Sequence, residues 1–192
     1  FEACNHRFVQ LEEPGWGVAI VNDSTYGHDV TRTVRADGDR GTTTTVRVSL
    51  LRAPRFPDPE TDQGVHRFRH ALVPGAGIAD AVREGWRINV PERRATGAGE
   101  VAPLVSVDED AVVVTAVKLA DDGSGDVVVR FHEAHGGRAR ATLTAGFEVA
   151  GAEVTDLLER PLPGAEAPRR DGGRIAVRLR PFELVTLRLR RS

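Results

Sequence analysis

The sequence is short of several residue types, and each shortage limits what the chain can be. It has no methionine and one cysteine, Cys4, so no disulfide can form within it and nothing indicates an oxidising compartment. Aromatic residues make up only 5% of the chain, and Lys118 is the only lysine. No apolar run approaches the roughly 20 residues that a membrane-spanning helix needs. A chain that begins at Phe1 and lacks methionine is expected to be an excised segment of a longer protein.

The charge balance limits the partners of the chain. Its 192 residues include 26 Lys and Arg against 28 Asp and Glu, which gives a formal net charge of -2. Because no strong field surrounds such a chain, we expect neither nucleic acid nor a membrane among its partners. With 40% hydrophobic and 28% charged residues, the composition is typical of a folded globular protein.

Short alternating segments separated by turns predict strands along most of the chain. A helix is predicted only over residues 78–84. Glycines flanked by little apolar content indicate a linker at residues 93–100. Strands are predicted at residues 17–21, 42–51, 66–73, 111–120, 126–134 and 138–143.

The alternation is clearest near the end of the chain. Apolar residues alternate with arginines over residues 174–180, and again with Thr186, Arg188 and Arg190 over residues 185–190. Such strands bury one face and expose the other, so we expect the guanidinium face in water.

Together these patterns predict an all-β fold of antiparallel β-sandwich type. Residues 1–92 are expected to form a first β segment, which is part of a larger sheet system with other strands upstream. Residues 101–192 are expected to form a smaller C-terminal β-sandwich, near the size at which a two-sheet core is stable alone.

The densest polar segment, residues 22–29, directly follows a predicted strand. It contains Asn22, Asp23, Tyr26 and His28, whose donors and acceptors suit the hydroxyl groups of a sugar. An ordinary turn explains the same residues, since Asn, Asp and Gly satisfy backbone groups in turns. The spacing alone favours the turn.

A second polar segment, residues 52–66, contains three prolines and the acids Asp58 and Asp62. The acids faintly resemble a calcium loop, but the bidentate glutamate that such a loop needs is missing. His66 lies four residues before His70 in a predicted strand, where the two would be about 13 Å apart and could not share a zinc ion. The residues therefore predict no metal site here.

Both segments lie within blocks that resemble glycoside hydrolase family 38, the retaining α-mannosidases, and most closely its bacterial members. The block VAIVNDSTYGHDV at residues 18–30 is similar to a motif in the C-terminal half of that family, and residues 50–68 resemble the next block. Residues 1–2 and 6–8 resemble the segment before them, and PFELVTL at residues 181–187 resembles the usual last strand. The blocks agree in order and spacing over nearly the whole chain.

The resemblance implies a function that this chain does not perform by itself. In that family an N-terminal catalytic domain carries an aspartate nucleophile, a second acid and a divalent metal, usually zinc, and hydrolyses terminal α-mannosides. The implied role here is a C-terminal β region with no catalytic residue, metal ligand or cofactor. Its partners would be its own catalytic domain, mannose-containing glycans and a second copy of the full-length enzyme. The implied location is the bacterial cytoplasm.

Family C-terminal domains wrap back onto the catalytic domain, and some loops reach the edge of the sugar site. The resemblance thus implies that segments 22–29 and 58–66 contact either the sugar or only the domain interface. Two alternatives stay open. A free-standing carbohydrate-binding module would use an exposed ring such as Trp16 or Trp86, and a structural or oligomerisation domain would use the arginine-rich face.

Overall fold

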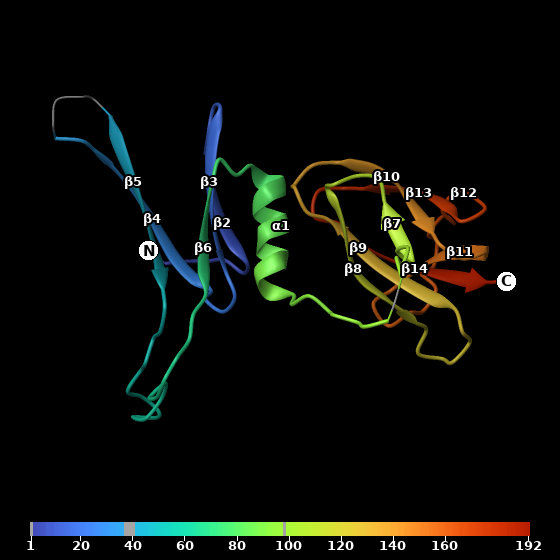
Figure 1. The fold of residues 1–192 in the computed structure, drawn as a ribbon, viewed down its shortest axis with the longest axis horizontal. Coiled ribbons are helices and arrows are strands. Elements are labelled where there is room, and N and C mark those ends of the chain that lie inside the picture. The colour runs from blue at the N-terminus through green and yellow to red at the C-terminus, as the bar shows by residue number, and fades with distance from the viewer. Residues whose placement is uncertain (1, 37–40, 98) are drawn as a thin grey trace. The chain divides into compact units, whose positions relative to one another are not determined.

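The computed structural model describes residues 2–36, 41–97 and 99–192. Its strands are antiparallel and it has one helix in the described residues, which confirms the predicted all-β class. The chain divides into two compact units, Phe1–Arg93 and Arg94–Ser192 (Figure 1).

The first unit contains two three-stranded sheets and the helix α1. The sheet orders are β1-β4-β5 and β2-β3-β6, and α1 packs on β3 and β2. The element bounds are β1 (Ala3–Cys4), β2 (Phe8–Glu13), β3 (Trp16–Asn22), β4 (Gly27–Val34), β5 (Thr42–Ser49), β6 (His70–Pro74) and α1 (Ile78–Asn89).

Small side chains let the helix approach the sheet closely. Ala19 on β3 and Ala81 on α1 are fully buried and form a cluster with Ala76 in the connection before the helix. A Cβ atom at Gly17 would lie 2.3 Å from the Ala76 carbonyl oxygen, so no larger residue fits there. This contact buries one face of the sheet β2-β3-β6.

The helix is longer than the predicted residues 78–84. It continues to Asn89 because Gly85, one turn beyond the buried Ala81, extends the buried stripe toward the sheet. It ends there because Val90 precedes Pro91, and a residue before proline disfavours the helical conformation.

Both tryptophans of the chain belong to this first unit. Trp86 on α1 is half-buried beneath the guanidinium group of Arg7, which lies 3.8 Å from the ring centroid, as in a cation–π contact. Trp16 begins β3 and is largely exposed. The second unit has no tryptophan.

Two predicted boundaries in this unit were wrong. The strand predicted over residues 66–73 begins only at His70, and the residues before it belong to a long connection. The polar segment 22–29 is not all loop, because β4 begins at Gly27 and includes His28. The sequence pattern did not predict β4, because this segment contains threonines and charged residues and few apolar residues.

The second unit is a sandwich of two four-stranded sheets. Their orders are β12-β13-β10-β7 and β11-β14-β9-β8. The strands are β7 (Val105–Val107), β8 (Val112–Leu119), β9 (Val127–Glu133), β10 (Ala139–Ala145), β11 (Val149–Thr155), β12 (Arg170–Asp171), β13 (Arg174–Leu179) and β14 (Leu184–Arg191).

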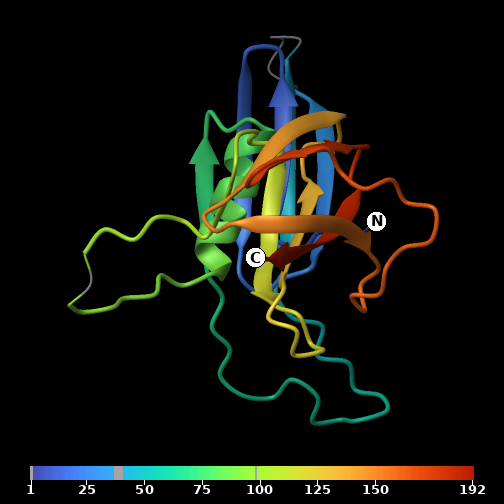
Figure 2. The same ribbon diagram turned by 90° about the vertical axis from the view of Figure 1, so that its right-hand side faces the viewer.

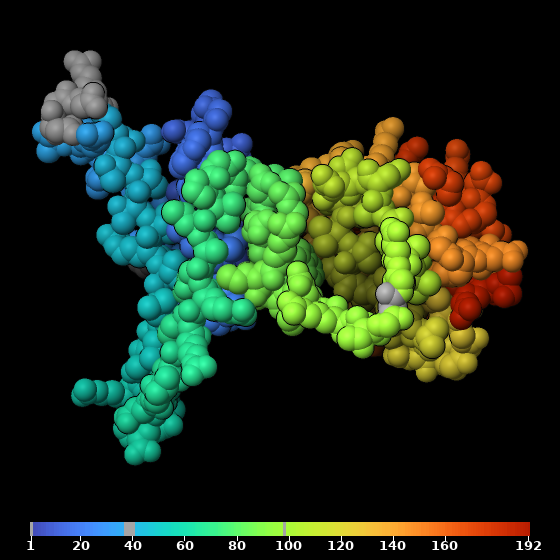
Figure 3. All heavy atoms as spheres, in the orientation of Figure 1, coloured from blue at the N-terminus to red at the C-terminus, as the bar shows by residue number. Residues whose placement is uncertain are grey.

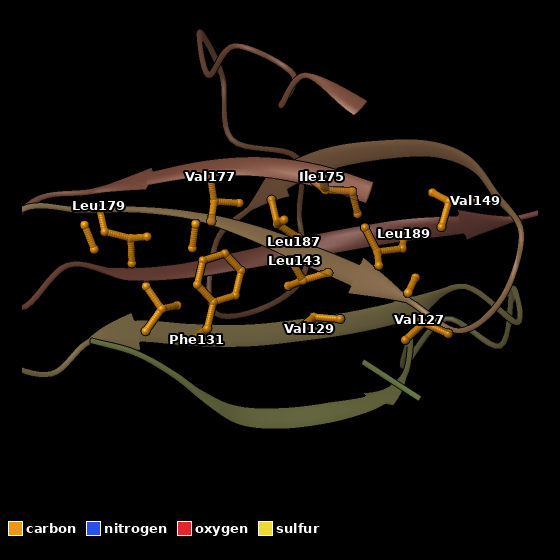
Figure 4. Close-up of a cluster of buried hydrophobic side chains, with 14 residues drawn as sticks. Val127, Val129, Phe131, Leu143, Val149, Ile175, Val177, Leu179, Leu187 and Leu189 are labelled. Atoms are coloured by element: carbon orange, nitrogen blue, oxygen red, sulfur yellow. The ribbon is translucent and has the colours of Figure 1, made fainter. Parts of the chain in front are cut away.

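A single apolar cluster fills the space between these two sheets (Figure 4). Phe131 on β9 and Leu187 on β14 come from one sheet, and Leu143 on β10 and Ile175 on β13 come from the other; all four are buried almost completely. Since each strand contributes alternate residues, the period-two pattern in the sequence is the direct cause of this core.

The prediction that the arginine-rich face lies in water is correct for β13 and wrong for part of β14. The arginines of β13 are exposed. Thr186 is buried, and the Arg188 side chain is only 16% exposed. Because β14 lies between β11 and β9, neighbouring side chains cover Arg188, whose guanidinium group pairs with Asp126 and Asp122 at 2.7 Å each.

A buried glutamate joins the two sheets of the second unit. Glu133 ends β9, and its carboxylate accepts hydrogen bonds from the backbone N–H groups of His135 at 2.8 Å, Gly136 at 2.9 Å and Phe182 at 2.9 Å. Burial alone would raise the pKa of this carboxyl group, but the backbone donors outweigh burial and hold the pKa below its usual value. Glu133 therefore fixes two of the connections that cross between the sheets, β9 to β10 and β13 to β14.

Replacing Glu133 with glutamine is expected to lower the melting temperature at neutral pH, because an amide group would face backbone donors. The carboxylate stabilises the fold above its unfolded pKa of about 4.3, and that stabilisation is lost as the pH falls through the lower folded pKa. The gap in melting temperature between wild type and Glu133→Gln should therefore narrow as the pH falls below about 4.3 in circular dichroism melts. Glu148→Gln, at an exposed position, is the control, and equal behaviour of the two variants would contradict this role.

Candidate functional site

Asn22 is a structural residue at the end of β3. It is 1% exposed, and its Oδ1 accepts hydrogen bonds from the N–H groups of Ser24 at 3.1 Å and Thr25 at 2.9 Å. Its carbonyl oxygen accepts from Asn89 Nδ2, at the end of α1, at 2.8 Å. The amide that sequence suggested for sugar binding is thus used to form the turn and to hold the helix.

Asp23 is held by an arginine 46 residues further along the chain. Its Oδ2 accepts from Arg69 Nε at 2.7 Å, and its Oδ1 accepts from Arg69 N at 3.1 Å and from Ser24 Oγ at 2.7 Å. These bonds, led by the Arg69 side chain, hold the pKa of Asp23 well below its usual range. Arg69 also donates to the Ile88 carbonyl at 3.3 Å, near the end of α1.

A second contact at the same place was not predicted. Thr25 is buried, and its Oγ1 forms a hydrogen bond of 3.0 Å with Nε2 of His70, the first residue of β6. Thr25 and His70 lie 45 residues apart in the sequence and meet only in the folded chain, so no local sequence signal identifies the pair. Residues 22–25 and 69–70 therefore form one polar cluster, which we call the root cluster.

Tyr26 and His28 differ in exposure. Tyr26 is 59% exposed and stacks on His6, with ring centroids 5.7 Å apart and planes at 20°. His28 lies on β4 opposite Ala3 and Val48, and its Nδ1 is buried without a hydrogen-bond partner in the part of the chain that the structure describes. Tyr26 and His6 are the rings that face solvent in this segment.

Residues 50–69 form a projecting connection between β5 and β6, which we call the arm (Figure 2). Asp62 Oδ2 accepts from the N–H of Ala53 at 3.1 Å, Asp58 Oδ1 accepts from the N–H of Glu60 at 2.9 Å, and His66 Nε2 lies 2.8 Å from the Asp62 carbonyl oxygen. All three predicted site residues of this segment are exposed and hold the arm's own shape.

The arm keeps this shape under some backbone strain and with exposed apolar residues. Ala53 and Asp62 have φ angles of 43° and 61°, in the left-handed region that most residues avoid. Phe56 is 87% exposed and Val65 is 92% exposed, and the arm projects away from the sheets of its unit (Figure 3). A structured surface segment with unburied apolar side chains is typical of a contact surface.

The two predicted segments meet at the base of the arm and not at its tip. Asp23 contacts Arg69 at its C-terminal end, Thr25 contacts His70 directly after it, and Glu2 pairs with Arg52 at 2.6 Å near its N-terminal end. Asp23 is bonded to Arg69 at the base of the arm, whereas Asp58 and Asp62 accept from backbone N–H groups within the arm itself.

Neither a metal-binding group nor a membrane-spanning helix is found in the described residues. No set of three or more His, Cys, Asp and Glu side chains in residues 2–36, 41–97 and 99–192 is placed to hold a metal ion. No helix in those ranges is long and apolar enough to cross a membrane. In the described residues, then, the geometry offers a fixed polar cluster and an exposed arm.

These features define a sandwich-type, all-β protein whose candidate contacts lie in the first unit. Matches to two family models identify the family to which this protein belongs. Residues 111–187 match the glycosyl hydrolases family 38 C-terminal beta sandwich domain, and residues 1–60 match the glycosyl hydrolases family 38 C-terminal domain. The chain therefore belongs to the C-terminal region of glycosyl hydrolase family 38, and the predicted resemblance is confirmed.

Similar proteins agree with this assignment. Alpha-mannosidase 2C1 of Homo sapiens is 34% identical over 98% of this chain, and an alpha-mannosidase of Saccharomyces cerevisiae is 29% identical over 98%. The chain spans only 18% and 19% of the length of these two relatives. A solved family 38 structure from Enterococcus faecalis has the same fold, with a TM-score of 0.66, 22% identity, and coverage of 99% of this chain and 23% of that one.

The root cluster can be tested by Asp23→Asn. An asparagine presents an NH2 group to one of the Arg69 donors, so amides at residues 23–25 and 69–70 are expected to exchange hydrogen several-fold faster. Asp29→Asn is the matched control, because Asp29 makes an exposed pair with Arg47, and exposed pairs contribute little. Hydrogen exchange with mass spectrometry measures both; faster exchange in Asp29→Asn alone would contradict the role of Asp23.

Proposed function

We propose that this chain is the non-catalytic C-terminal β region of a retaining α-mannosidase, and that it supports a catalytic domain outside the chain. The observation that carries the proposal is coverage. Relatives named alpha-mannosidase match 98% of this chain, but each is about five times as long as this chain. The hydrolysis of terminal α-mannosides then takes place elsewhere in the enzyme.

The catalytic metal is assigned to that other part as well. A zinc site needs three or four converging nitrogen, sulfur or oxygen ligands, and the described residues present no such set. The exposed Cys4, with no disulfide partner in the chain, supports a cytoplasmic enzyme.

The arm is the proposed contact with the catalytic domain. The root cluster uses the polar groups of Asn22 and Asp23 internally, which leaves little of them for a sugar. The arm instead presents Phe56 and Val65 to solvent, and the burial of such side chains against a partner stabilises an interface. Asp58, Asp62 and His66 then act by shaping the arm at the domain interface.

A carbohydrate contact is the second candidate, and one observation favours it. Tyr26 and His6 form an exposed stacked pair, and sugar faces bind to exposed rings. If the mannose-containing glycan reaches this part of the enzyme, Tyr26 presents an exposed ring to it. Loss of mannoside binding in Tyr26→Ala, with the fold unchanged, would support this role.

The main proposal predicts that residues 1–192 alone do not hydrolyse an aryl α-mannoside and do not retain zinc after dialysis. The full-length enzyme is expected to hydrolyse the mannoside and to retain zinc, because it supplies the nucleophile, acid and metal ligands. Metal-dependent turnover by the isolated chain would refute the non-catalytic role. An inactive full-length enzyme with bound metal would instead refute the mannoside substrate.

The arm contact predicts that Val65→Asp lowers the melting temperature and the turnover of the full-length enzyme, because a charge would enter an apolar interface. Val101→Asp is the matched control, since Val101 is 78% exposed and lies outside the arm. In the isolated chain both variants should melt like wild type. Equal effects of the two variants in the full-length enzyme would argue against the arm as the contact.

A further inference from the structure

The turn between β13 and β14 holds an aromatic residue in an unusual backbone conformation. The turn runs from Arg180 to Glu183, whose N–H donates to the Arg180 carbonyl oxygen at 3.0 Å. Phe182 has a φ angle of 57°, and Pro181 precedes it. This is the pattern of a type II turn, in which glycine normally takes the third position because other residues are strained there. The phenylalanine at this position therefore destabilises the turn relative to a glycine.

The strained turn presents the ring of Phe182 to solvent. The backbone N–H of Phe182 donates to the buried Glu133 carboxylate at 2.9 Å, which fixes the residue in place. The ring lies over Gly136, where a Cβ atom would come within 2.9 Å of Phe182 Cζ, yet the residue is 72% exposed. Since the ring gains so little burial, packing does not account for the strain. Strained residues that the surrounding structure holds in place are concentrated at ligand-binding sites.

Two arginines lie directly opposite each other on the neighbouring strands. Arg140 on β10 pairs in register with Arg178 on β13, and alternation places both on the outer face of their sheet. Like charges at directly opposite positions destabilise a sheet. Among the described residues, neither guanidinium group has a hydrogen bond or ion pair, and the same holds for Arg138, directly before β10. Arg188 on the other sheet, by contrast, is neutralised by two aspartates. An anion on the outer face of β10 and β13 would remove the repulsion.

The neighbouring strands leave these arginines open. β7 pairs with β10 only over residues 143–145, and β12 pairs with β13 only over residues 174–175. Both contacts lie at the far end of the sheet, so within the described residues the other end consists of two strands. At this other end the connections β9 to β10 and β13 to β14 meet, because Glu133 joins them. We call this surface the cationic end, and it consists of Arg138, Arg140, Arg178 and Phe182.

The acids nearest to the cationic end are already bonded. Glu183 accepts from the Arg180 side chain at 3.0 Å, and Glu133 accepts from three backbone N–H groups. Asp108 accepts from the Thr142 N–H at 2.6 Å, further along the sheet. The positive charge of the cationic end is therefore left for a ligand, and charge of one sign attracts a ligand of the other.

We propose that the cationic end binds a sugar that carries an anionic group, either a phosphate or a carboxylate. The Phe182 ring stacks on the apolar face of the sugar, as exposed aromatic rings do. Arg140 and Arg178 donate to the anion, because the flat guanidinium fork suits phosphate and carboxylate oxygens. The bound anion also removes the repulsion between these two arginines. The choice of a sugar rests on the proposed function, whereas the choice of an anion rests only on the charge of this surface.

Titration calorimetry on residues 1–192 tests this site, since the proposed catalytic site lies outside this chain. Mannose 6-phosphate and glucuronic acid are the two anionic probes, and mannose and inorganic phosphate each supply one half of the ligand. One anionic sugar is expected to bind at least roughly tenfold more tightly than mannose or inorganic phosphate, because it makes both contacts. The better probe identifies the anion. Anionic sugars that bind no more tightly than either half would overturn the proposal.

The arginine contact is tested with Arg178→Gln. Affinity for the anionic sugar should fall about tenfold, because the variant removes a charge-assisted hydrogen bond. Arg190→Gln is the matched control, since Arg190 is an exposed arginine on the other sheet of the same unit, and its affinity should equal that of wild type. Equal losses in the two variants would show general charge attraction and overturn the site.

Phe182→Gly separates binding from folding. Because glycine suits a positive φ angle, the variant should melt close to the wild-type temperature. Its affinity for the anionic sugar should nevertheless fall about tenfold, because the stacking ring is lost. A lower melting temperature with unchanged affinity would show that the ring is structural and would overturn the proposal.

The cationic end must also stay open in the full-length enzyme. Hydroxyl radicals should oxidise Phe182 equally fast in the full-length enzyme and in residues 1–192. Much slower oxidation in the full-length enzyme would show that another domain or a second copy covers the ring, and would overturn the proposal. A chain that binds the anionic sugar, together with a full-length enzyme that hydrolyses no mannoside, would refute the proposed function alone.

Discussion

A β-sheet in water needs an apolar partner for at least one face, and the rest of this structure depends on how that need is met. In the second unit two four-stranded sheets meet it for each other, with Phe131 and Leu143 among the shared core. In the first unit a helix covers one sheet through the small residues Ala19 and Ala81, and the hairpin of β4 and β5 has no comparable cover among the described residues. The second unit thus buries its two sheets against each other, whereas the first has sheet surfaces without such cover.

Polar groups fix the connections that the apolar cores leave unspecified. Glu133 binds backbone donors from two crossing connections, and Asp23 binds Arg69 at the base of the arm. Both carboxylates have lowered pKa values because donors converge on them. In neither place does a depressed pKa indicate acid–base chemistry; it reflects a structural bond between segments far apart in sequence.

The sequence predicted the fold wherever alternation was regular, as in β9, β13 and β14. It failed where the determining contact is distant. β4 is rich in threonine and charge, and pairing with β5 makes it a strand. The cover of Arg188 depends on the central place of β14 in its sheet, which no local pattern shows. For the candidate site, the sequence singles out the two polar segments but not their partners Arg69 and His70, because hydrogen bonds across 45 residues or more leave no spacing signal.

The uneven distribution of tryptophan makes the two units optically distinguishable. Trp86 lies beneath Arg7 and Trp16 begins β3, so intrinsic fluorescence originates only in the first unit. Far-ultraviolet ellipticity, by contrast, sums over the strands of both. Unfolding curves from the two signals would coincide if the units denature together and separate if they denature independently. One unlabelled sample can therefore reveal whether the first unit melts before the second.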